Sequence, residues 1–363
     1  MRFPLTVLII YLHSFGDPLT ENPTLGLAIY DNVRIFFSHI LSRVAVPTFL
    51  VISGYLFFRK TEEIFDAAIY KKKLVSRYHS IFIPYVLWNL GYLLQIVVAK
   101  SAKIIIKHED ANIIGYFNEH GWLNMFWACN QWPYRTSWFG WEITTSGPLL
   151  VPLWYLRDLI VAFLLSWLIW KVIKKTGWLI VALLFFCDMS GLWPNIPGLE
   201  AYAISYFVLG SYMAINKMNL VSTFSSYSKP ILGVTFVLTV LMLYFKSDFT
   251  KTGNYIYPFF ELFGMMSVFI MGGRIVQSNG RLSKIPRLFT ESSFFVYAIH
   301  TILILMISYK VTYFLIPNGN PALMTIRYMV TPLFCATICV SIYWILSCCT
   351  PRLLKIMTGG RSK

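Results

Sequence analysis

The chain carries few charged residues for its length. Only 13% of its 363 residues are Asp, Glu, Lys or Arg, about half the share found in soluble domains. Hydrophobic residues make up 57% of the chain and the mean hydropathy is +0.61, which leaves little polar surface to face water. These values exclude an intrinsically disordered chain and a small disulfide-rich scaffold. They predict an all-α polytopic membrane protein.

The chain also lacks a metal-binding pattern. Its six cysteines form no CxxC pair, and no histidine lies at a zinc-type spacing from any of them. Cys335 and Cys339 share one face of an apolar run, where a free thiol acts as a small hydrophobic side chain. We therefore expect no metal site, and we expect the cysteines to have structural roles.

Ten apolar runs follow one another along the chain, and we interpret them as about ten transmembrane helices. They cover roughly the ranges 3–15, 35–58, 80–99, 149–172, 177–189, 199–215, 230–245, 255–275, 292–314 and 325–349. Most of the 31 basic residues lie in the loops on one side of these runs. By the positive-inside rule that side is cytoplasmic, so both termini are expected in the cytoplasm. We expect one membrane domain over 1–350 and a short basic cytoplasmic tail over 351–363.

The net charge of +15 fits this topology. On a soluble protein such an excess of basic residues would suggest a nucleic-acid partner. Here the basic residues gather in the predicted cytoplasmic loops, as the positive-inside rule requires. We therefore expect the lipid bilayer, and no nucleic acid, as the partner of these charges.

The first apolar run is short. Residues 3–15 rise only about 20 Å as a helix, against a hydrocarbon core about 30 Å thick. A signal peptide does not explain the run, because no small-x-small cleavage site follows His13. We expect instead that a few residues precede Met1 in the natural protein.

Arg2 and His13 occupy one face of this first run. Their spacing of eleven residues is three helical turns plus about 20°, which places Arg2 at the cytoplasmic edge and His13 near mid-membrane. A permanent cation can hold a phosphate, and a neutral imidazole can take a proton from a hydroxyl. The alternative is structural: Arg2 only sets the topology, and His13 only satisfies a packing contact.

The second run also carries buried polar residues. His39 and Arg43 lie four residues apart, followed by Pro47, which should kink the helix, and Gly54, which permits a close backbone approach. An arginine this deep needs a carboxylate, exposed carbonyl groups or a ligand phosphate. Glu261, in the middle of the eighth run, is the carboxylate that the sequence offers. Arg43 is therefore either a clamp on the kink or part of a site.

Two further clusters lie outside the apolar runs. A basic stretch runs from Lys71 to Arg77 and is either a cytoplasmic anchor or a landing site for an anionic cofactor. The predicted external loop over 100–147 holds five of the twelve tryptophans. Flat aromatic faces suit sugar rings, although tryptophan also gathers at bilayer interfaces for anchoring.

Four stretches, in the same order, resemble acyltransferase family 3, the multi-spanning O-acyltransferases that modify bacterial surface polysaccharides and related glycans. The first is Arg2 and His13, with ten residues between them. The others are SRVAVP at 42–47 running into ISGYL at 52–56, PLWYL at 152–156, and the stretch 293–300 that ends in YAIH. The resemblance covers most of the chain.

The resemblance implies an enzyme of the bacterial inner membrane that transfers an acyl group, usually acetyl, from cytoplasmic acyl-CoA to a sugar hydroxyl. The family's essential histidine and its paired arginine correspond to His13 and Arg2. The family's basic pair before the third span has its nearest match in Lys73 and Arg77, which are one residue further apart here. The donor is a substrate, and no tightly bound cofactor is implied.

The helix geometry supports a mechanism. A CoA phosphate near Arg2 places the thioester near His13 if the pantetheine arm follows the helix face. His13 then acts as general base on the acceptor hydroxyl, and Arg43 stabilises the developing oxyanion. An acyl-histidine relay is equally compatible with the sequence. The residues expected to contact the carbohydrate acceptor are Trp132, Trp138, Trp154, Tyr297 and His300.

Two other functions stay open at this point. Ten spans, a proline-kinked helix and buried histidine, arginine and glutamate also suit a proton-coupled transporter or exporter of a glycan or small molecule. Inverted repeats and paired broken helices, which are common in such carriers, are not evident in the sequence. A structural subunit of a synthase complex is the third possibility.

Overall fold

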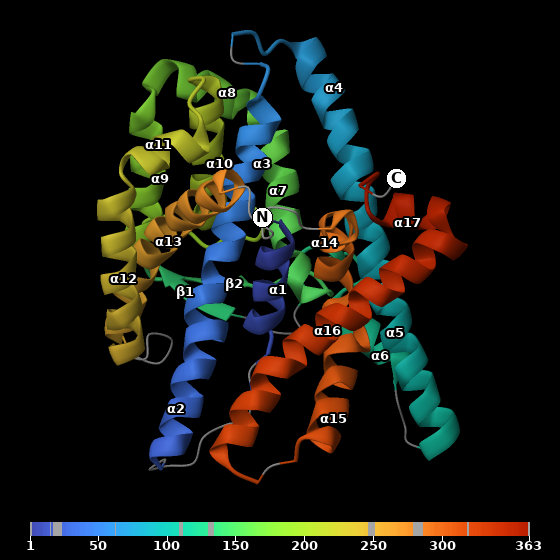
Figure 1. Ribbon diagram of the computed structural model, residues 1–363. Helices are drawn as coiled ribbons and strands as arrows, with labels where there is room; N and C mark the ends of the chain where they lie inside the picture. The colour runs from blue at the N-terminus through green and yellow to red at the C-terminus, as the bar shows by residue number, and fades with distance from the viewer. Residues whose placement is uncertain are drawn as a thin grey trace. The chain divides into compact units, whose positions relative to one another are not determined.

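The computed structural model describes residues 2–14, 16, 24–61, 63–108, 112–129, 134–245, 251–278, 286–317 and 319–361, and it is mainly helical (Figure 1). The chain divides into two compact units. The first comprises residues 1–49 and 218–349, and the second comprises residues 50–217 and 350–363.

Six helical stretches are long and apolar enough to cross a membrane: Leu25–Phe58, Ala67–Ile106, Ser228–Phe245, Tyr255–Gln277, Arg287–Leu315 and Pro321–Cys349. Three shorter apolar helices are Arg2–Leu12, Trp178–Ser190 and Ala201–Ile215. The remaining predicted run, 149–172, corresponds largely to two consecutive helices, α7 (Trp154–Leu164) and α8 (Ser166–Thr176). The prediction of a helical membrane protein is therefore confirmed.

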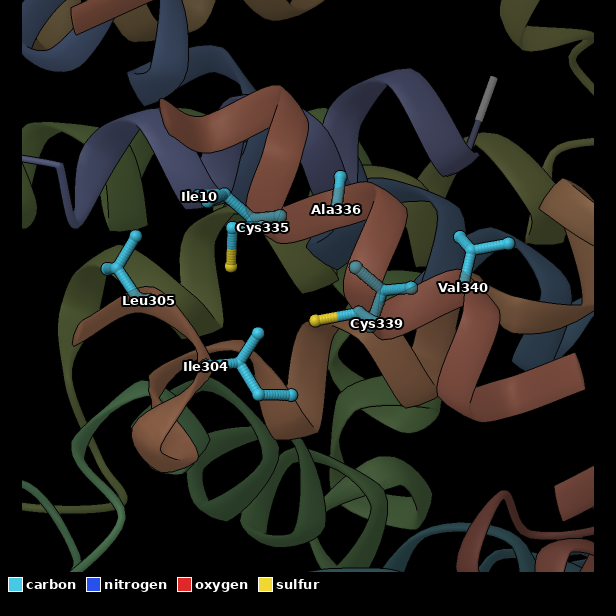
Figure 2. Close-up of a cluster of buried hydrophobic side chains, with 8 residues drawn as sticks. Ile10, Ile304, Leu305, Cys335, Ala336, Cys339 and Val340 are labelled. Carbon is cyan, nitrogen blue, oxygen red and sulfur yellow. The ribbon is translucent and has the colours of Figure 1, made fainter. Parts of the chain in front are cut away.

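The core of the first unit forms where three helices meet. The short helix α1 (Arg2–Leu12) packs against α14 (Arg287–Ile299) and α16 (Pro321–Cys349). Figure 2 shows Ile10 of α1 beside Cys335 of α16, with Cys339 further along the same helix, in a buried aliphatic cluster. Both thiols are fully buried, as expected of cysteines that act as small hydrophobic side chains.

The second helical stretch begins ten residues earlier than the sequence predicted, because α2 (Leu25–Arg34) precedes the apolar run. The helix then changes pitch twice, through a π-helical turn (Ile35–Ile40) and a 3₁₀ turn (Leu41–Val44). It continues as α3 (Ala45–Phe58), in which Pro47 lies in the first turn. A proline is tolerated there because the first-turn N–H groups have no intrahelical acceptor.

A second break interrupts the stretch Arg287–Leu315. After α14 the chain passes through a π-helical turn (His300–Ile304) before α15 (Leu305–Leu315). Ile302 has ψ 85° and Leu303 has φ 62°, so neither residue is helical. The first unit also contains the short helix α11 (Leu220–Ser226) and a pair of packed helices, α12 (Ser228–Phe245) and α13 (Lys251–Gln277).

The second unit contains α4 (Ala67–Arg77), a π-helical turn (Tyr78–Phe82), α5 (Ile83–Lys107), α6 (Ile113–His120), α7, α8, α9 (Trp178–Ser190) and α10 (Ala201–Ile215). The part of α3 in this unit crosses α10 at two glycines. A Cβ on Gly54 would lie 2.1 Å from the Phe207 carbonyl oxygen, and a Cβ on Gly210 would lie 2.0 Å from the Val51 carbonyl oxygen. This confirms the close backbone approach expected at Gly54.

The tryptophan-rich region within residues 100–147 contains a β-hairpin that was not predicted from the sequence. Strand β1 (Tyr134–Trp138) pairs antiparallel with β2 (Trp141–Thr145), and Trp138 is opposite Trp141. The two turn residues, Phe139 and Gly140, both have positive φ, at 47° and 84°. This is the backbone geometry of the two-residue turns that match the twist of a hairpin.

The described part of the basic tail, residues 351–361, contains a short helix. It forms α17 (Pro351–Met357), which packs against α5, and the Trp88 indole N–H donates to the Met357 carbonyl at 3.0 Å. Gly359 has φ +64°, and a Cβ there would lie 2.2 Å from the Ser80 carbonyl oxygen. A glycine is therefore required for the tail to pack this closely on the π-helical turn.

Candidate active site

The structure brings His13 and His300 together. His13 directly follows the last residue of α1, and His300 is the first residue of the π-helical turn after α14. Their ring centroids are 5.3 Å apart, with an angle of 41° between the ring planes. His13 is half-buried and His300 is completely buried. The predicted base and the second histidine predicted for the site are thus neighbours.

The ring of His300 is held from its own helix. Its Nδ1 lies 2.8 Å from the Tyr297 carbonyl oxygen, and a carbonyl only accepts, so Nδ1 carries the proton of the neutral ring. Nε2 is then a bare acceptor, and it is buried without a hydrogen-bond partner. Tyr297 itself is almost fully buried, with its ring centroid 6.5 Å from that of His300.

The backbone around His13 is held by Ser38, which the sequence reading missed. The Ser38 Oγ lies 2.5 Å from the Tyr11 carbonyl oxygen and 2.8 Å from the Ser14 carbonyl oxygen, on both sides of His13. Helix ends leave carbonyl groups without intrahelical partners, and a buried hydroxyl can satisfy them. The hydroxyl of Tyr328, on α16, lies 2.6 Å from Ser38 Oγ.

Arg2 and Arg43, the two arginines predicted for the catalytic site, both belong to the first unit but lie on different elements. Arg2 is exposed at the first residue of α1, roughly 16 Å along the axis from His13. Arg43 lies on the 3₁₀ turn, which packs against α1, and its guanidinium stacks 4.7 Å from the ring centroid of Tyr257 on α13. Glu261 lies one turn further along α13 and is 4% exposed.

A polar group on α2 was also missed by the sequence reading. The Arg34 guanidinium forms an ion pair with Asp31 at 2.8 Å, and another of its nitrogens lies 3.5 Å from His39 Nε2. The π-helical turn brings residues five apart onto one face, whereas an α-helix brings residues three and four apart together. His39 is therefore directed to Arg34 by the local change of pitch.

Lys73 and Arg77, the predicted cofactor-binding pair, lie in the second unit on α4. The Lys73 ammonium donates to the Phe57 carbonyl, at the end of α3, and lies 5.1 Å from the Phe57 ring centroid. Arg77 lies over the rings of Phe57 and Phe163, at 5.7 and 5.2 Å. A cation at a helix C-terminus offsets the partial negative charge of the terminal carbonyls. Both side chains are half-buried.

The predicted acceptor-binding tryptophans have different surroundings. Trp132 lies outside the described residues. Trp138 is half-buried, and its indole N–H donates to the Leu192 carbonyl at 3.0 Å. Trp154, at the start of α7, is also half-buried, with its ring 6.2 Å from that of Tyr202. Trp141, opposite Trp138 in the hairpin, is 74% exposed.

Arg157 is the most completely buried cation of the second unit among the described residues. It pairs with Asp158 at 2.8 Å and with Glu200 at 3.0 Å. It also donates to the carbonyls of Trp127 and Ser146. A buried arginine with this many acceptors fixes the segments that supply them. Arg157 therefore ties the region around the hairpin to α7 and to the start of α10.

Comparison with known proteins identifies the class of this helical membrane protein. A family model described as an acyltransferase domain matches residues 1–348. The chain therefore belongs to acyltransferase family 3. The succinoglycan biosynthesis protein ExoH of Rhizobium meliloti (strain 1021) is 25% identical over 255 residues. That match covers 69% of this chain and 62% of the relative, which is less than two thirds of the relative's length. No solved structure matches the chain.

Proposed function

We propose that the protein is a membrane O-acyltransferase that moves an acyl group, acetyl in the simplest case, from cytoplasmic acyl-CoA to a hydroxyl of a surface polysaccharide or glycan precursor. The contact between His13 and His300 carries this proposal, because it places a half-buried imidazole beside a fully buried one in an acyltransferase chain. The name of the relative, a succinoglycan biosynthesis protein, supports a polysaccharide acceptor.

The chemistry is a balanced acyl transfer. A ring nitrogen of His13 takes the proton of the acceptor hydroxyl while the hydroxyl oxygen attacks the thioester carbonyl carbon. The tetrahedral intermediate collapses with cleavage of the C–S bond, and the leaving CoA thiolate receives the proton from His13. The products are an ester of the glycan and free CoA. Arg43 is assigned to the oxyanion because its turn packs against α1.

The donor and acceptor contacts are proposed residue by residue. Arg2 in the first unit, and Lys73 and Arg77 in the second, are assigned to the CoA phosphates because all three are basic residues of the predicted cytoplasmic side. The acceptor contacts are Trp132, Trp138, Trp154 and Tyr297, because aromatic faces suit sugar rings. His300, the fifth residue expected to contact the acceptor, is completely buried, and we do not assign it to the acceptor.

The membrane placement follows from the charge bias of the loops. We assign ten spans in a bacterial inner membrane, both termini in the cytoplasm, one domain over 1–350 and a cytoplasmic tail over 351–363. Labelling of a Lys72→Cys variant from the outside alone would contradict this orientation.

The direct test uses the purified protein in nanodiscs with radiolabelled acetyl-CoA and a bacterial polysaccharide. Label that becomes base-labile and covalently attached to the glycan supports the proposal. Label that stays on CoA with several polysaccharides and several acyl donors contradicts it. Movement of unmodified glycan across proteoliposomes without transfer of label would favour the transporter alternative, for which the helix break at Leu303 is the structural argument.

A further inference from the structure

His300 is arranged as a hydrogen-bond acceptor. Its Nδ1–H is committed to the Tyr297 carbonyl, and its Nε2 lone pair is buried without a partner. A buried polar atom without a partner is destabilising, so one that lies beside a second histidine points to a function. The ring of His13, the residue after α1, lies 5.3 Å from the His300 ring between centroids.

The helix break fixes His300 in this position. Its carbonyl accepts the N–H of Leu305 across the π-helical turn, and the thiol of Cys335 lies 3.9 Å from the same oxygen. Leu303 has a positive φ of 62°, which is unfavourable for a leucine and persists only where the surroundings hold it. Figure 2 shows Cys335 on α16 next to Ile304 and Leu305, the residues that end the break.

His300 is also poorly placed to touch a substrate. Its side chain has no exposed surface, whereas His13 is half-buried. Of the two residues, His13 is the less buried, so we assign the contact with the acceptor hydroxyl to His13. A role for His300 in the reaction must therefore act through His13.

We propose that His300 is a positioning residue, which orients His13 and accepts a hydrogen bond from its ring N–H during acyl transfer. When the N–H of neutral His13 points to His300 Nε2, the other ring nitrogen of His13 has a free lone pair. That lone pair takes the proton of the acceptor hydroxyl. When His13 becomes an imidazolium, its N–H is donated to His300 Nε2, and this stabilises a charge in an apolar site. His300 stays neutral, and the proton taken from the hydroxyl returns to the CoA thiolate.

No hydrogen bond joins the two rings in the structure described here, so the contact has to shorten as His13 gains its proton. Catalytic hydrogen bonds are often long in the absence of substrate and tighten only in the reacting complex. The arrangement follows the logic of a base that is oriented by a third group. The inference rests on the proposed function, because it needs a base at His13.

The test compares three variants in the acyl-transfer assay. His300→Leu removes the acceptor and should lower kcat by about 10²-fold while the KM values of both substrates change less than about twofold. His300→Gln retains an amide oxygen that can accept, and it should recover at least about a tenth of the parent kcat. In a His13→Ala background, His300→Leu should cost nothing further, because residues that act as a unit are not additive.

Cys339→Ala is the matched control, since it removes a buried thiol from the adjacent aliphatic cluster. It should lower thermal stability and leave kcat unchanged. A merely structural role for His300 predicts equal losses in the leucine and glutamine variants, or a loss that adds to that of His13→Ala; either result overturns the proposal. If the parent protein transfers no acyl group, the proposed function fails. If it does and the His300 series behaves additively, only this inference fails.

Discussion

The hydroxyl of Tyr328, on α16, donates to the hydroxyl of Ser38 in the π-helical turn, with 2.6 Å between the two oxygens. We infer that Tyr328 is the donor because Ser38 has a single hydroxyl proton. That proton is donated to the carbonyls of Tyr11 and Ser14, so Ser38 can only accept from Tyr328. Those carbonyls flank His13. The two hydroxyls therefore connect α16 and the π-helical turn to the backbone that presents the proposed base.

Loss of the Ser38 hydroxyl should make the position of the His13 side chain less well defined, while the imidazole itself is retained. We expect Ser38→Ala to lower kcat by roughly tenfold or more, because small misplacements of a catalytic group are costly. Ser205→Ala is the control, since Ser205 is equally buried but hydrogen-bonds only to Ala201 of its own helix. Steady-state kinetics on both variants check this. Equal kcat values for Ser38→Ala and the parent would remove Ser38 from the site.

Neutralisation of the predicted donor-binding residues should act on one substrate. We expect Arg2→Gln, Lys73→Gln and Arg77→Gln each to raise the KM for acyl-CoA several-fold, with smaller effects on the acceptor KM, because each removes a cation assigned to a phosphate. Lys175→Gln, an exposed basic residue of α8, is the control. If the three variants only lower thermal stability and leave both KM values unchanged, Lys73 and Arg77 serve as helix anchors.

Substitution in the β-hairpin should affect the use of the carbohydrate acceptor. We expect Trp138→Ala to raise the acceptor KM several-fold and to leave acyl-CoA binding intact, because a flat aromatic face is lost from the proposed glycan surface. Isothermal titration with acyl-CoA and kinetics with the acceptor separate the two effects. Unchanged acceptor kinetics would leave Trp138 with only its hydrogen bond to Leu192 and an anchoring role.

The docking of the tail can be tested with two neighbouring glycines. Gly359→Ala puts a Cβ against the Ser80 carbonyl, whereas Gly360 also has a positive φ, +77°, but has nothing within 4 Å of its Cβ position. We expect Gly359→Ala to release α17 and to speed tryptic cleavage at Arg352 and Lys355, and Gly360→Ala to do so far less. Equal cleavage rates in the two variants would show that backbone strain alone governs the tail.

Hydropathy and local motifs predicted the helical membrane class, the helical runs and the family, because these depend on residues close together in the chain. The contact between His13 and His300 was not predictable in the same way. It depends on the packing of α1 against α14, which are separated by most of the sequence. The role of Ser38 was hidden for another reason. Its position depends on a π-helical turn, which follows no apolar periodicity.

Some features could be located from the sequence, but their structural detail could not. Pro47 pointed to an irregular helix, and the structure places the irregularity just before it, at Leu41–Val44. The tryptophan cluster suggested a surface but gave no sign of strands, because the signal at Phe139 and Gly140 is a single turn. Arg157 directly follows the PLWYL stretch, but its role could not be inferred from the sequence because its partner Glu200 is distant in the chain.

The central claim is that His13 is the base for acyl transfer, and the turnover of His13→Ala tests it most directly. General-base loss costs about 10²–10⁴-fold in rate, so transfer of label from acetyl-CoA to glycan should nearly stop. The variant should still insert into the membrane and bind acyl-CoA, and His79→Ala, an exposed histidine on the turn after α4, should retain the parent rate. If His13→Ala keeps more than about a tenth of the parent turnover, the account is contradicted.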